Sequence, residues 1–226
     1  MLNTTLDGAR AERLLLGLRP VVEEHGLSLG VATAGDPDNA PAGPGEERLL
    51  RDMLPARRRE FAAGRCAARR ALVRAGLPAG EILATGRRPT MPPGSVGSIT
   101  HTGDTAAAIA APRRYYRALG IDLELRPLPR EAAHVVLTPD ERTWANHGPG
   151  HEAEGRLLAC FSAKEAAFKA FSALLPPEDA PTTLLAIAVR PAPGGFRAWP
   201  RRLPDRALDI AVRPLGPGVL SWTAAP

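Results

Sequence analysis

Two acidic residues, Asp122 and Glu124, stand two positions apart in the apolar stretch 120–125, GIDLEL. Alternate residues of a strand face the same side, so the two carboxylates would lie together, about 6–7 Å apart, opposite the isoleucine and the leucines. Paired carboxylates supply the hard oxygen ligands that Mg²⁺ prefers. The same pattern is also typical of a surface strand with a solvated acidic face, and both interpretations stay open at this point.

Three charged residues interrupt the apolar side of a second segment, FSAKEAAFKAF at 161–171. On a helix of about 100° per residue, Lys164 and Glu165 fall within about 60° of Phe161, inside or beside its apolar stripe. Lys169 lies a little further round the helix. Charges at such positions indicate a specific partner or a function. The alternative is an ordinary i,i+4 ion pair between Glu165 and Lys169.

A histidine ends a predicted strand, 94–101, just before a Thr-Gly-Asp turn. In this strand Ser98 and Thr100 share one face, and His101 lies on the other. Residues where strands lead into loops often carry binding sites, so we take His101 as a candidate for a contact to a phosphate or a ribose. A purely structural histidine is the alternative.

The basic residues are divided unevenly between the two types. Lysine and arginine together number 29 against 24 acidic residues, and only Lys164 and Lys169 are lysines. A compact ammonium differs from a guanidinium where a point charge meets a phosphate, so these two lysines are the more informative cations.

An arginine-rich segment, RRREFAAGR, occupies residues 57–65. It is typical of a solvated basic face or, alternatively, of bidentate phosphate recognition by Arg57 and Arg65. On a continuous helix these two arginines would diverge by about 80° and 12 Å. A shared ligand therefore requires that the chain around Arg57 is not yet helical.

Length and composition limit the class of protein. The chain has 226 residues, 44% hydrophobic and 23% charged, which suits one large or two small globular domains. No run of about 18 apolar residues indicates a transmembrane helix, and the polar N-terminus argues against a signal peptide. Cys66 and Cys160 lack metal-ligand spacing and are predicted to be reduced, packed thiols, so we expect a cytoplasmic protein without zinc.

Each half of the sequence contains one major helical segment and several strand-like segments. The major helices are predicted at 57–75 and 157–174, where glycine or proline follows, with shorter ones at 11–17 and 139–144. Strands are predicted at 27–32, 94–101, 105–111, 118–125, 184–190, 196–200 and 208–212, and loops at 34–46 and 147–155. The sequence therefore predicts an α+β fold of two halves, residues 1–114 and 115–226.

Four of these segments together resemble one family, the two-domain, surfactin- and enterobactin-type 4′-phosphopantetheinyl transferases. The family signatures G-[IV]-D-x-E and [FW]-[ST]-x-K-E-[AS]-x-x-K stand here as GIDLE (120–124) and FSAKEAAFK (161–169). The upstream signatures R-x-x-E-[FY]-x-x-x-R and G-S-[IL]-[ST]-H stand as RRREFAAGR and GSITH. One departure is Met91-Pro92-Pro93-Gly94, where the family often has W-P-x-G. The missing indole affects pocket packing and removes no catalytic group.

The resemblance implies an activity and a set of site residues. The family transfers the phosphopantetheine arm of coenzyme A to a serine of an apo carrier protein and releases adenosine 3′,5′-bisphosphate. It implies Mg²⁺, with Mn²⁺ as an alternative, bound by Asp122, Glu124 and Glu165. It further implies Lys164 and Lys169 near the pyrophosphate, and Glu165, acting directly or through a metal-bound water, as the candidate base. Arg57, Arg65 and His101 would hold the 3′-phosphate and adenine end, with Ser98 and Thr100 as further coenzyme contacts.

The resemblance also implies an architecture and partners. Its two α+β halves are related by a pseudo-twofold axis, with the active site where they meet, the coenzyme contacts in the first half and the metal ligands in the second. The expected partners are coenzyme A and acyl or peptidyl carrier proteins, whose acidic character suits a basic chain. We expect a monomer that contacts neither nucleic acid nor membrane. A basic nucleic-acid-binding module and a catalytically degenerate coenzyme-A-binding relative remain the alternatives.

Overall fold

The computed structural model describes residues 6–86, 88–147 and 150–226, and only the backbone at His151. These residues form two compact units. The N-terminal unit comprises residues 7–119 together with Pro226, and the C-terminal unit comprises residues 120–225 together with Leu6. The expectations of a pseudo-twofold axis and of an active site where the halves meet stay predictions.

The N-terminal unit combines helices with a three-stranded sheet of order β1-β5-β4, in which both pairs are antiparallel. A separate two-stranded ribbon pairs β2 with β3. The elements in chain order are α1 (Gly8–Gly17), α2 (Arg19–Glu23), β1 (Ser28–Thr33), α3 (Pro44–Arg51), α4 (Pro55–Arg74), β2 (Leu83–Thr85), β3 (Arg88–Thr90), β4 (Ser95–Thr102) and β5 (Thr105–Pro112).

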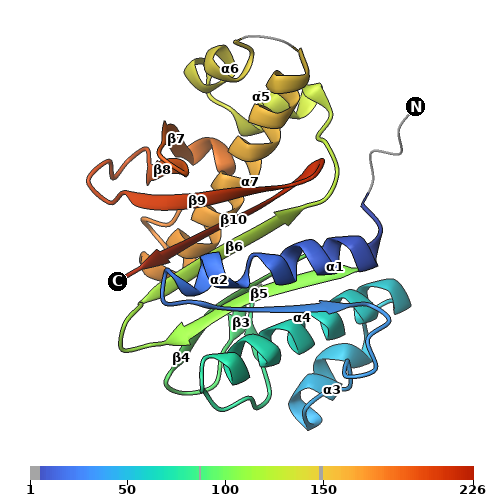
Figure 1. The fold of residues 1–226 in the computed structure, drawn as a ribbon. Helices are drawn as coiled ribbons and strands as arrows, with labels where there is room; N and C mark the ends of the chain where they lie inside the picture. Colours follow the sequence, from blue (N-terminus) through green and yellow to red (C-terminus); the bar gives the residue numbers. More distant parts are fainter. Residues whose placement is uncertain (1–5, 87, 148–149) are drawn as a thin grey trace. The chain divides into compact units, whose positions relative to one another are not determined.

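Helix α4 packs on the sheet of this unit, against β1, β5 and β4, while α1 contacts β1 and β5 (Figure 1). Gly30 of β1 permits the approach of α4, because a Cβ at that position would overlap the carbonyl oxygen of Ala67. A buried cluster of small side chains fills this contact, including Ala63, Ala67 and Ala108. Helix and sheet are therefore close enough for main-chain atoms to touch.

The C-terminal unit contains a five-stranded sheet of order β6-β10-β9-β8-β7, so that β6 and β7 form its edges. Between β6 and β7 the chain forms the helices of this unit. The elements in chain order are β6 (Ala118–Glu124), η1 (Arg130–Ala132), α5 (Ala133–Val136), α6 (Pro139–Ala145), α7 (Gly150–Leu174), η2 (Leu184–Ala186), β7 (Ile187–Ala192), β8 (Gly195–Pro200), β9 (Leu208–Leu215) and β10 (Gly218–Ala225).

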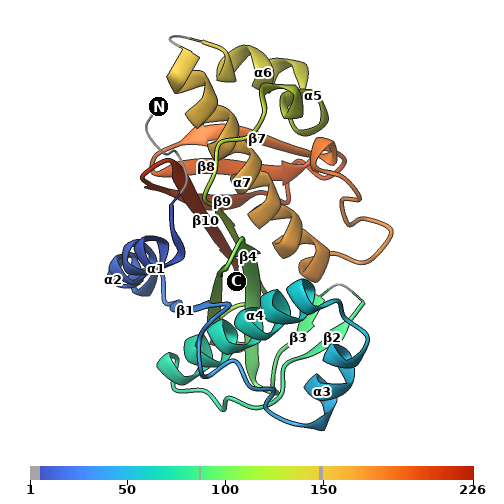
Figure 2. The same cartoon turned by 90° about the vertical axis from the view of Figure 1, so that its right-hand side faces the viewer.

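The long helix α7 crosses the five-stranded sheet and contacts β10, β9, β8 and β7 (Figure 2). Gly120 of β6 lies against this helix, and a Cβ there would overlap the carbonyl oxygen of Ala166. Gly120, Asp122 and Glu124 alternate along β6 and share one face. The two acidic residues therefore face α7, the helix that carries the second charged motif.

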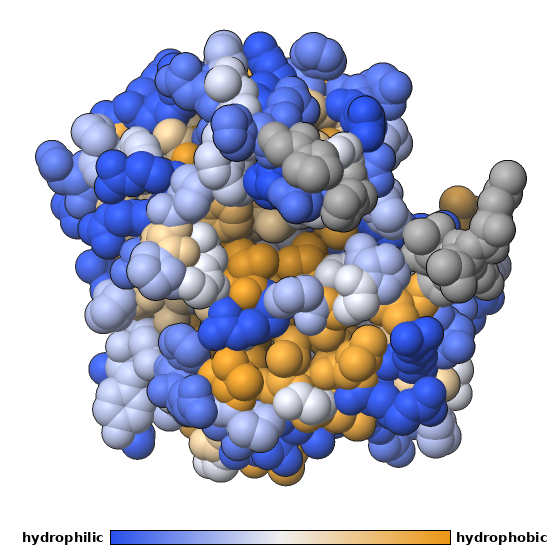
Figure 3. All heavy atoms as spheres, turned by 45° about the horizontal axis from the view of Figure 1, so that its top comes forward, coloured by the Kyte–Doolittle hydropathy of each residue, from blue (hydrophilic) through white to orange (hydrophobic). Residues whose placement is uncertain are grey.

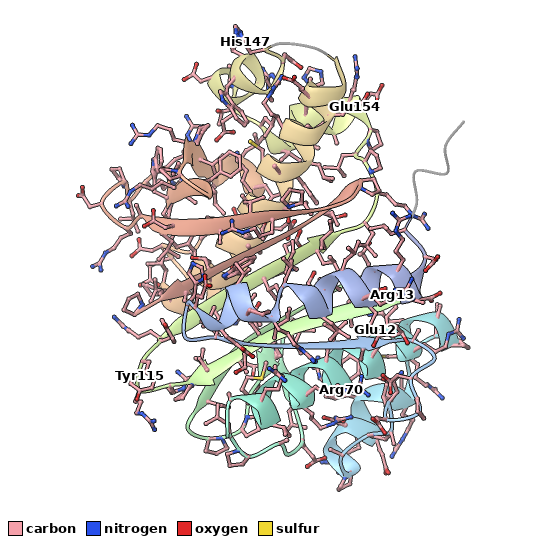
Figure 4. The ribbon with its side chains drawn as sticks, in the orientation of Figure 1. Glu12, Arg13, Arg70, Tyr115, His147 and Glu154 are labelled. Atoms are coloured by element: carbon pink, nitrogen blue, oxygen red, sulfur yellow. The ribbon has the colours of Figure 1, made fainter. Side chains whose placement is uncertain are left out.

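The same local construction occurs in both units. In the N-terminal unit Arg70 of α4, labelled in Figure 4, donates to the carbonyl oxygen of Val31 at 2.9 Å, one residue after Gly30. In the C-terminal unit Lys169 of α7 donates to the carbonyl oxygen of Ile121 at 2.8 Å, one residue after Gly120. Each unit thus fastens its long helix to the strand directly beside the close-approach glycine.

Most predicted elements are confirmed within about three residues. The expected loop at 34–46 is wrong from Pro44 onward, because α3 begins there. The short elements α2, α5, β2 and β3, the helix α3 and the strand β10 were not predicted.

Helix α7 begins at Gly150, so the part of the expected loop from residue 150 onward is wrong, while residues 148–149 lie outside the described residues. Glu152 lies in the first turn and ion-pairs with Arg156 at i,i+4, which stabilises this extension. Residues 184–186 form a 3₁₀ turn in place of the expected start of a strand.

Both cysteines are buried and form no disulfide, as the sequence predicts. Burial raises the pKa of the Cys160 thiol to about 12, so this side chain behaves as a packing residue.

On the face shown in Figure 3, hydrophobic side chains gather in the middle and hydrophilic side chains surround them. No helix among the described residues is long and apolar enough to cross a membrane.

Candidate functional site

The acidic strand β6 is bound to α7 by Lys169. The Nζ atom of Lys169 lies 2.9 Å from Oδ1 of Asp122 and 2.8 Å from the carbonyl oxygen of Ile121. Ser162 of α7 also donates, at 3.4 Å, to the carbonyl oxygen of Asp122. Asp122 is only 4% exposed. The alternative of a solvated acidic strand face is therefore wrong for Asp122, and the structure brings together both charged motifs of this unit.

The other two candidate metal ligands have perturbed acidity. Burial, with the negative charges of Asp122 and Glu165, raises the pKa of Glu124 to about 7, although Lys169 opposes the shift. Burial and Asp122 also raise the pKa of Glu165, again against Lys169. Three carboxylates thus share a region that disfavours three negative charges.

This arrangement fits a divalent cation by the chemistry of its donors. Carboxylate oxygens are the ligands of Mg²⁺ and Mn²⁺. The negative charges of neighbouring carboxylates help to raise the pKa of Glu124 and Glu165, and a dication bound there would offset those charges. No three His, Cys, Asp or Glu side chains among the described residues are already gathered as a metal-binding group. Asp122, Glu124 and Glu165 therefore have suitable chemistry without a preformed coordination shell.

Lys164 lies on the apolar side of α7, and its partners belong to the protein. Its side chain is completely buried, and Nζ donates to Oε2 of Glu141 at 2.6 Å and to the carbonyl oxygen of Val136 at 2.8 Å. A longer contact of 3.4 Å reaches the carbonyl oxygen of Leu184. These contacts argue against the expected contact of Lys164 with the pyrophosphate.

Glu141, which the sequence analysis missed, accepts hydrogen bonds through both carboxylate oxygens. Besides Lys164, it binds the backbone N–H of Val189 at 2.9 Å and that of Thr138 at 2.8 Å. Thr138 and Glu141 form the capping box of α6. The spacing Thr-x-x-Glu at the start of this helix is a sequence signal for that cap, although it does not indicate the long-range partners.

In the N-terminal unit the structure brings Arg57 and His101 together. Nη1 of Arg57 lies 2.6 Å from Nε2 of His101 and 3.1 Å from Oε2 of Glu60. Glu60 is also 4.0 Å from Nδ1 of His101. The side chains of Arg57 and His101 are 54% and 33% exposed, so both can reach a ligand. This pair offers a guanidinium and an imidazole to an anion.

Arg65 is separate from this pair. Helix α4 begins at Pro55, so the expectation of a non-helical chain around Arg57 is wrong, and the two arginines diverge along one helix. Arg65 is buried and donates to the carbonyl oxygens of Ile82 at 2.7 Å and Leu83 at 3.1 Å. Its guanidinium also lies over the ring of Phe61. The expected clamp of Arg57 and Arg65 on one phosphate is therefore corrected.

Ser98 and Thr100 lie on β4 and are each 5% exposed. Ile99, between them, faces α4, because a Cβ at Gly64 of that helix would contact its side chain. By alternation His101 faces α4 with Ile99, and Ser98 and Thr100 face the other side of the sheet, as the sequence predicts. The structure therefore does not group the two hydroxyls with the exposed pair Arg57 and His101.

Comparisons with known proteins agree with the motifs. Residues 45–111 match the family model described as the 4′-phosphopantetheinyl transferase N-terminal domain, and residues 118–192 match that of the 4′-phosphopantetheinyl transferase superfamily.

Curated relatives are similar over a large part of the chain. The 4′-phosphopantetheinyl transferase Npt of Nocardia iowensis is 38% identical over 60% of this chain and 61% of its own length. The 4′-phosphopantetheinyl transferase Svp of Streptomyces mobaraensis is 41% identical over 57% of this chain and 53% of its own. Enterobactin synthase component D of Salmonella typhi is 36% identical over 54% of this chain and 52% of its own.

The matched stretch thus spans between about half and three fifths of these relatives. The two stretches that match the family models contain all four motifs and together make up more than half of the chain. The chain therefore belongs to the 4′-phosphopantetheinyl transferase superfamily.

Proposed function

We propose that this protein transfers the 4′-phosphopantetheine group of coenzyme A to a serine of an apo carrier protein. The serine oxygen forms a bond to the β-phosphorus of the pyrophosphate, the bond to the bridging oxygen breaks, and adenosine 3′,5′-bisphosphate leaves. The observation that carries the proposal is the buried junction of β6 and α7, where Lys169 meets Asp122 beside Glu124 and Glu165. Family membership supplies the reaction class.

Asp122, Glu124 and Glu165 would hold Mg²⁺ or Mn²⁺. When bound, the cation supplies charge neutralisation for the pyrophosphate oxygens. Phosphoryl transfer depends mainly on positioning and on stabilising charge, so side chains fixed in place suit it. Lys169, held by Ile121 and Asp122, adds a positive charge for the leaving phosphate.

Glu165 is the proposed acceptor of the serine proton. Burial raises its pKa, which makes its carboxylate a stronger base than an exposed glutamate. A carboxylate oxygen of Glu165 would take the proton from the serine hydroxyl as the oxygen attacks phosphorus. Lys169, which opposes the shift, limits how far the pKa rises.

Arg57 and His101 are proposed to bind the 3′-phosphate of coenzyme A. Both are partly exposed and 2.6 Å apart, and charge-assisted hydrogen bonds from a guanidinium suit a phosphate. Contacts of Ser98 and Thr100 with the coenzyme stay predictions.

The partners of the arginines on α4 argue against the alternative of a nucleic-acid-binding module. Arg65 binds backbone carbonyls, Arg69 binds Glu46, and Arg70 binds Asp36 and Asp38. A helix whose cations are paired in this way offers few charges to a phosphate backbone.

The test is mass spectrometry of an apo carrier protein after incubation with the protein, coenzyme A and Mg²⁺. A gain of about 340 Da, the mass of the phosphopantetheine group that this cofactor carries, supports the proposal. Glu165→Gln should abolish the gain, and the matched control Glu152→Gln, an exposed glutamate of the same helix, should retain it. No gain with any acyl or peptidyl carrier, together with a salt-sensitive gel shift of DNA, would favour the nucleic-acid alternative.

A further inference from the structure

The buried pair of Lys164 and Glu141 connects α7 to several other parts of the C-terminal unit. An ammonium group has three N–H donors. Those of Lys164 are directed to Glu141 at 2.6 Å, Val136 at 2.8 Å and, at a longer 3.4 Å, Leu184. The pair thereby links α7 to the end of α5, to α6 and to the turn η2. No donor of this fully buried lysine is left for a substrate.

Glu141 extends the same connection to the sheet. Its Oε1 accepts from the backbone N–H of Val189 in β7, and its Oε2 accepts from Thr138 and from Lys164. If Lys164 turned toward a phosphate, this carboxylate would lose its cation while still buried, which is strongly unfavourable. The contacts of both partners thus oppose a substrate-binding role for Lys164.

The N-terminal unit contains a buried glutamate of the same kind. Glu46 of α3, 1% exposed, accepts from Arg69 of α4 at 2.9 Å. It also accepts from the backbone N–H groups of Ile82 at 2.8 Å and Ala42 at 3.0 Å. In both units, a buried glutamate on a short helix binds a cation of the long helix and two backbone N–H groups. This repetition indicates a structural element that fixes a long helix.

We propose that Lys164 and Glu141 are positioning residues, which fix the turn of α7 that carries Glu165 and Lys169, and that Lys164 does not touch coenzyme A. The kinetic part of this inference rests on the proposed transferase activity. Lys164 immediately precedes Glu165 on the helix, so a change in its anchoring displaces the proposed base more directly than it alters coenzyme binding.

A double-mutant cycle with Lys164→Met and Glu141→Gln tests the inference. Lys164→Met leaves a buried carboxylate without its cation, so we expect the Tm to fall by about 5 °C or more. We expect kcat to fall about ten-fold or more, while KM for coenzyme A stays within about two-fold. Adding Glu141→Gln removes the uncompensated charge, and it should recover at least about half of both the lost Tm and the lost log kcat.

A control cycle uses an exposed ion pair that also links α7 to the segment before α6. Arg130 and Glu154 are 68% and 45% exposed, so Arg130→Met and Glu154→Gln should leave Tm and kcat nearly unchanged and show no coupling. Glu154, labelled in Figure 4, lies near the start of α7.

Two results would overturn the inference. One is a Lys164→Met variant with wild-type Tm and raised KM, and the other is a double variant whose stability recovers while kcat stays at the level of Lys164→Met. Either result assigns Lys164 to the substrate. If Lys164→Met does not fold, the single variant Glu141→Gln is tested in its place. The inference then requires that this variant has a lower Tm and a lower kcat than wild type, with KM for coenzyme A unchanged. If the wild-type protein transfers nothing, the transferase proposal fails, whereas coupling in Tm still tests the anchor.

Discussion

Lys169 and Asp122 form an ion pair of 2.9 Å between α7 and β6, and the same ammonium binds the carbonyl oxygen of Ile121 at 2.8 Å. Lys169 therefore holds the strand that carries the acidic motif, while its side chain remains 28% exposed. A group that is both anchored and accessible can meet a ligand without reorganising, which suits electrostatic stabilisation of a transferred phosphate.

Replacement of Lys169 by arginine should be damaging, although nearly all other cations of this chain are arginine. The planar guanidinium is larger than an ammonium and cannot take the same point between a carbonyl and a carboxylate. We expect kcat to fall about ten-fold or more, equivalent to about 1.4 kcal/mol or more. Steady-state kinetics at saturating coenzyme A measure the change. A wild-type kcat would indicate that Lys169 serves only as a link between helix and strand.

Gly120→Ala should destabilise the protein because the added Cβ would overlap a carbonyl oxygen of α7. Main-chain atoms cannot rotate away, so we expect a loss of about 1–3 kcal/mol in the free energy of unfolding. The matched control is Gly155→Ala in α7, where the added Cβ would have no atom within 4 Å. That variant should gain up to about 1 kcal/mol. Urea unfolding distinguishes the two, and equal effects would contradict the close approach.

The stability of the metal-free protein should depend on the protonation of Glu124. Its pKa is raised from 4.5 to about 7, so the folded state binds a proton more tightly than the unfolded chain. The stabilisation from this proton is complete below about pH 4.5 and is lost as the pH rises through about 7. Glu124→Gln should therefore gain stability relative to wild type as the pH rises through this window. Thermal unfolding measures the difference at each pH.

Glu131→Gln serves as the control for that experiment, because Glu131 is exposed on η1. Its Tm difference from wild type should stay flat across the same pH values. A difference for Glu124→Gln that does not change with pH would contradict the burial of this carboxyl beside Asp122.

Arg57→Ala should weaken coenzyme binding more than chemistry, because the 3′-phosphate is remote from the transferred group. One charge-assisted hydrogen bond contributes about 1.5–3 kcal/mol, so KM for coenzyme A should rise about ten-fold or more. KM for dephospho-coenzyme A should change much less. The control is Arg58→Ala, since Arg58 is directed to the carbonyl oxygen of Arg51. If Arg57→Ala keeps the wild-type preference between the two coenzymes, Arg57 does not bind the 3′-phosphate.

Arg65→Met should have the opposite signature from Arg57→Ala. Burial lowers the pKa of Arg65 to about 10, and its guanidinium serves two main-chain carbonyls. Loss of these donors leaves buried acceptors unsatisfied, at about 1–3 kcal/mol each. We expect a lower Tm with KM for coenzyme A unchanged. A raised KM for coenzyme A, with the Tm of the wild type, would indicate that Arg65 binds the coenzyme.

Local patterns in the sequence predicted the parts of the fold that depend on neighbouring residues. Alternation placed Asp122 with Glu124 on one face of β6, and His101 opposite Ser98 on β4. Strand β10 was missed because nearly all of its residues are buried, so its sequence, GVLSWTAA, has no alternation to detect.

The roles of the buried cations could not be predicted, because their partners lie far away in the sequence. Lys164 binds residues 20 and 28 positions away, and Arg65 binds residues 17 and 18 positions away. Motif spacing identifies a charge on an apolar face, but only the fold shows whether that charge faces a ligand or the protein itself.

The contact between Gly120 and Ala166 also affects how this protein can change over time. The separation of β6 and α7 is limited by main-chain atoms, which are the same in every sequence that keeps the glycine. Core side chains elsewhere in the unit can therefore drift in size and shape while Asp122 stays at the same distance from Glu165 and Lys169. A family can in this way diverge widely in its hydrophobic core and still inherit an unchanged arrangement of charges.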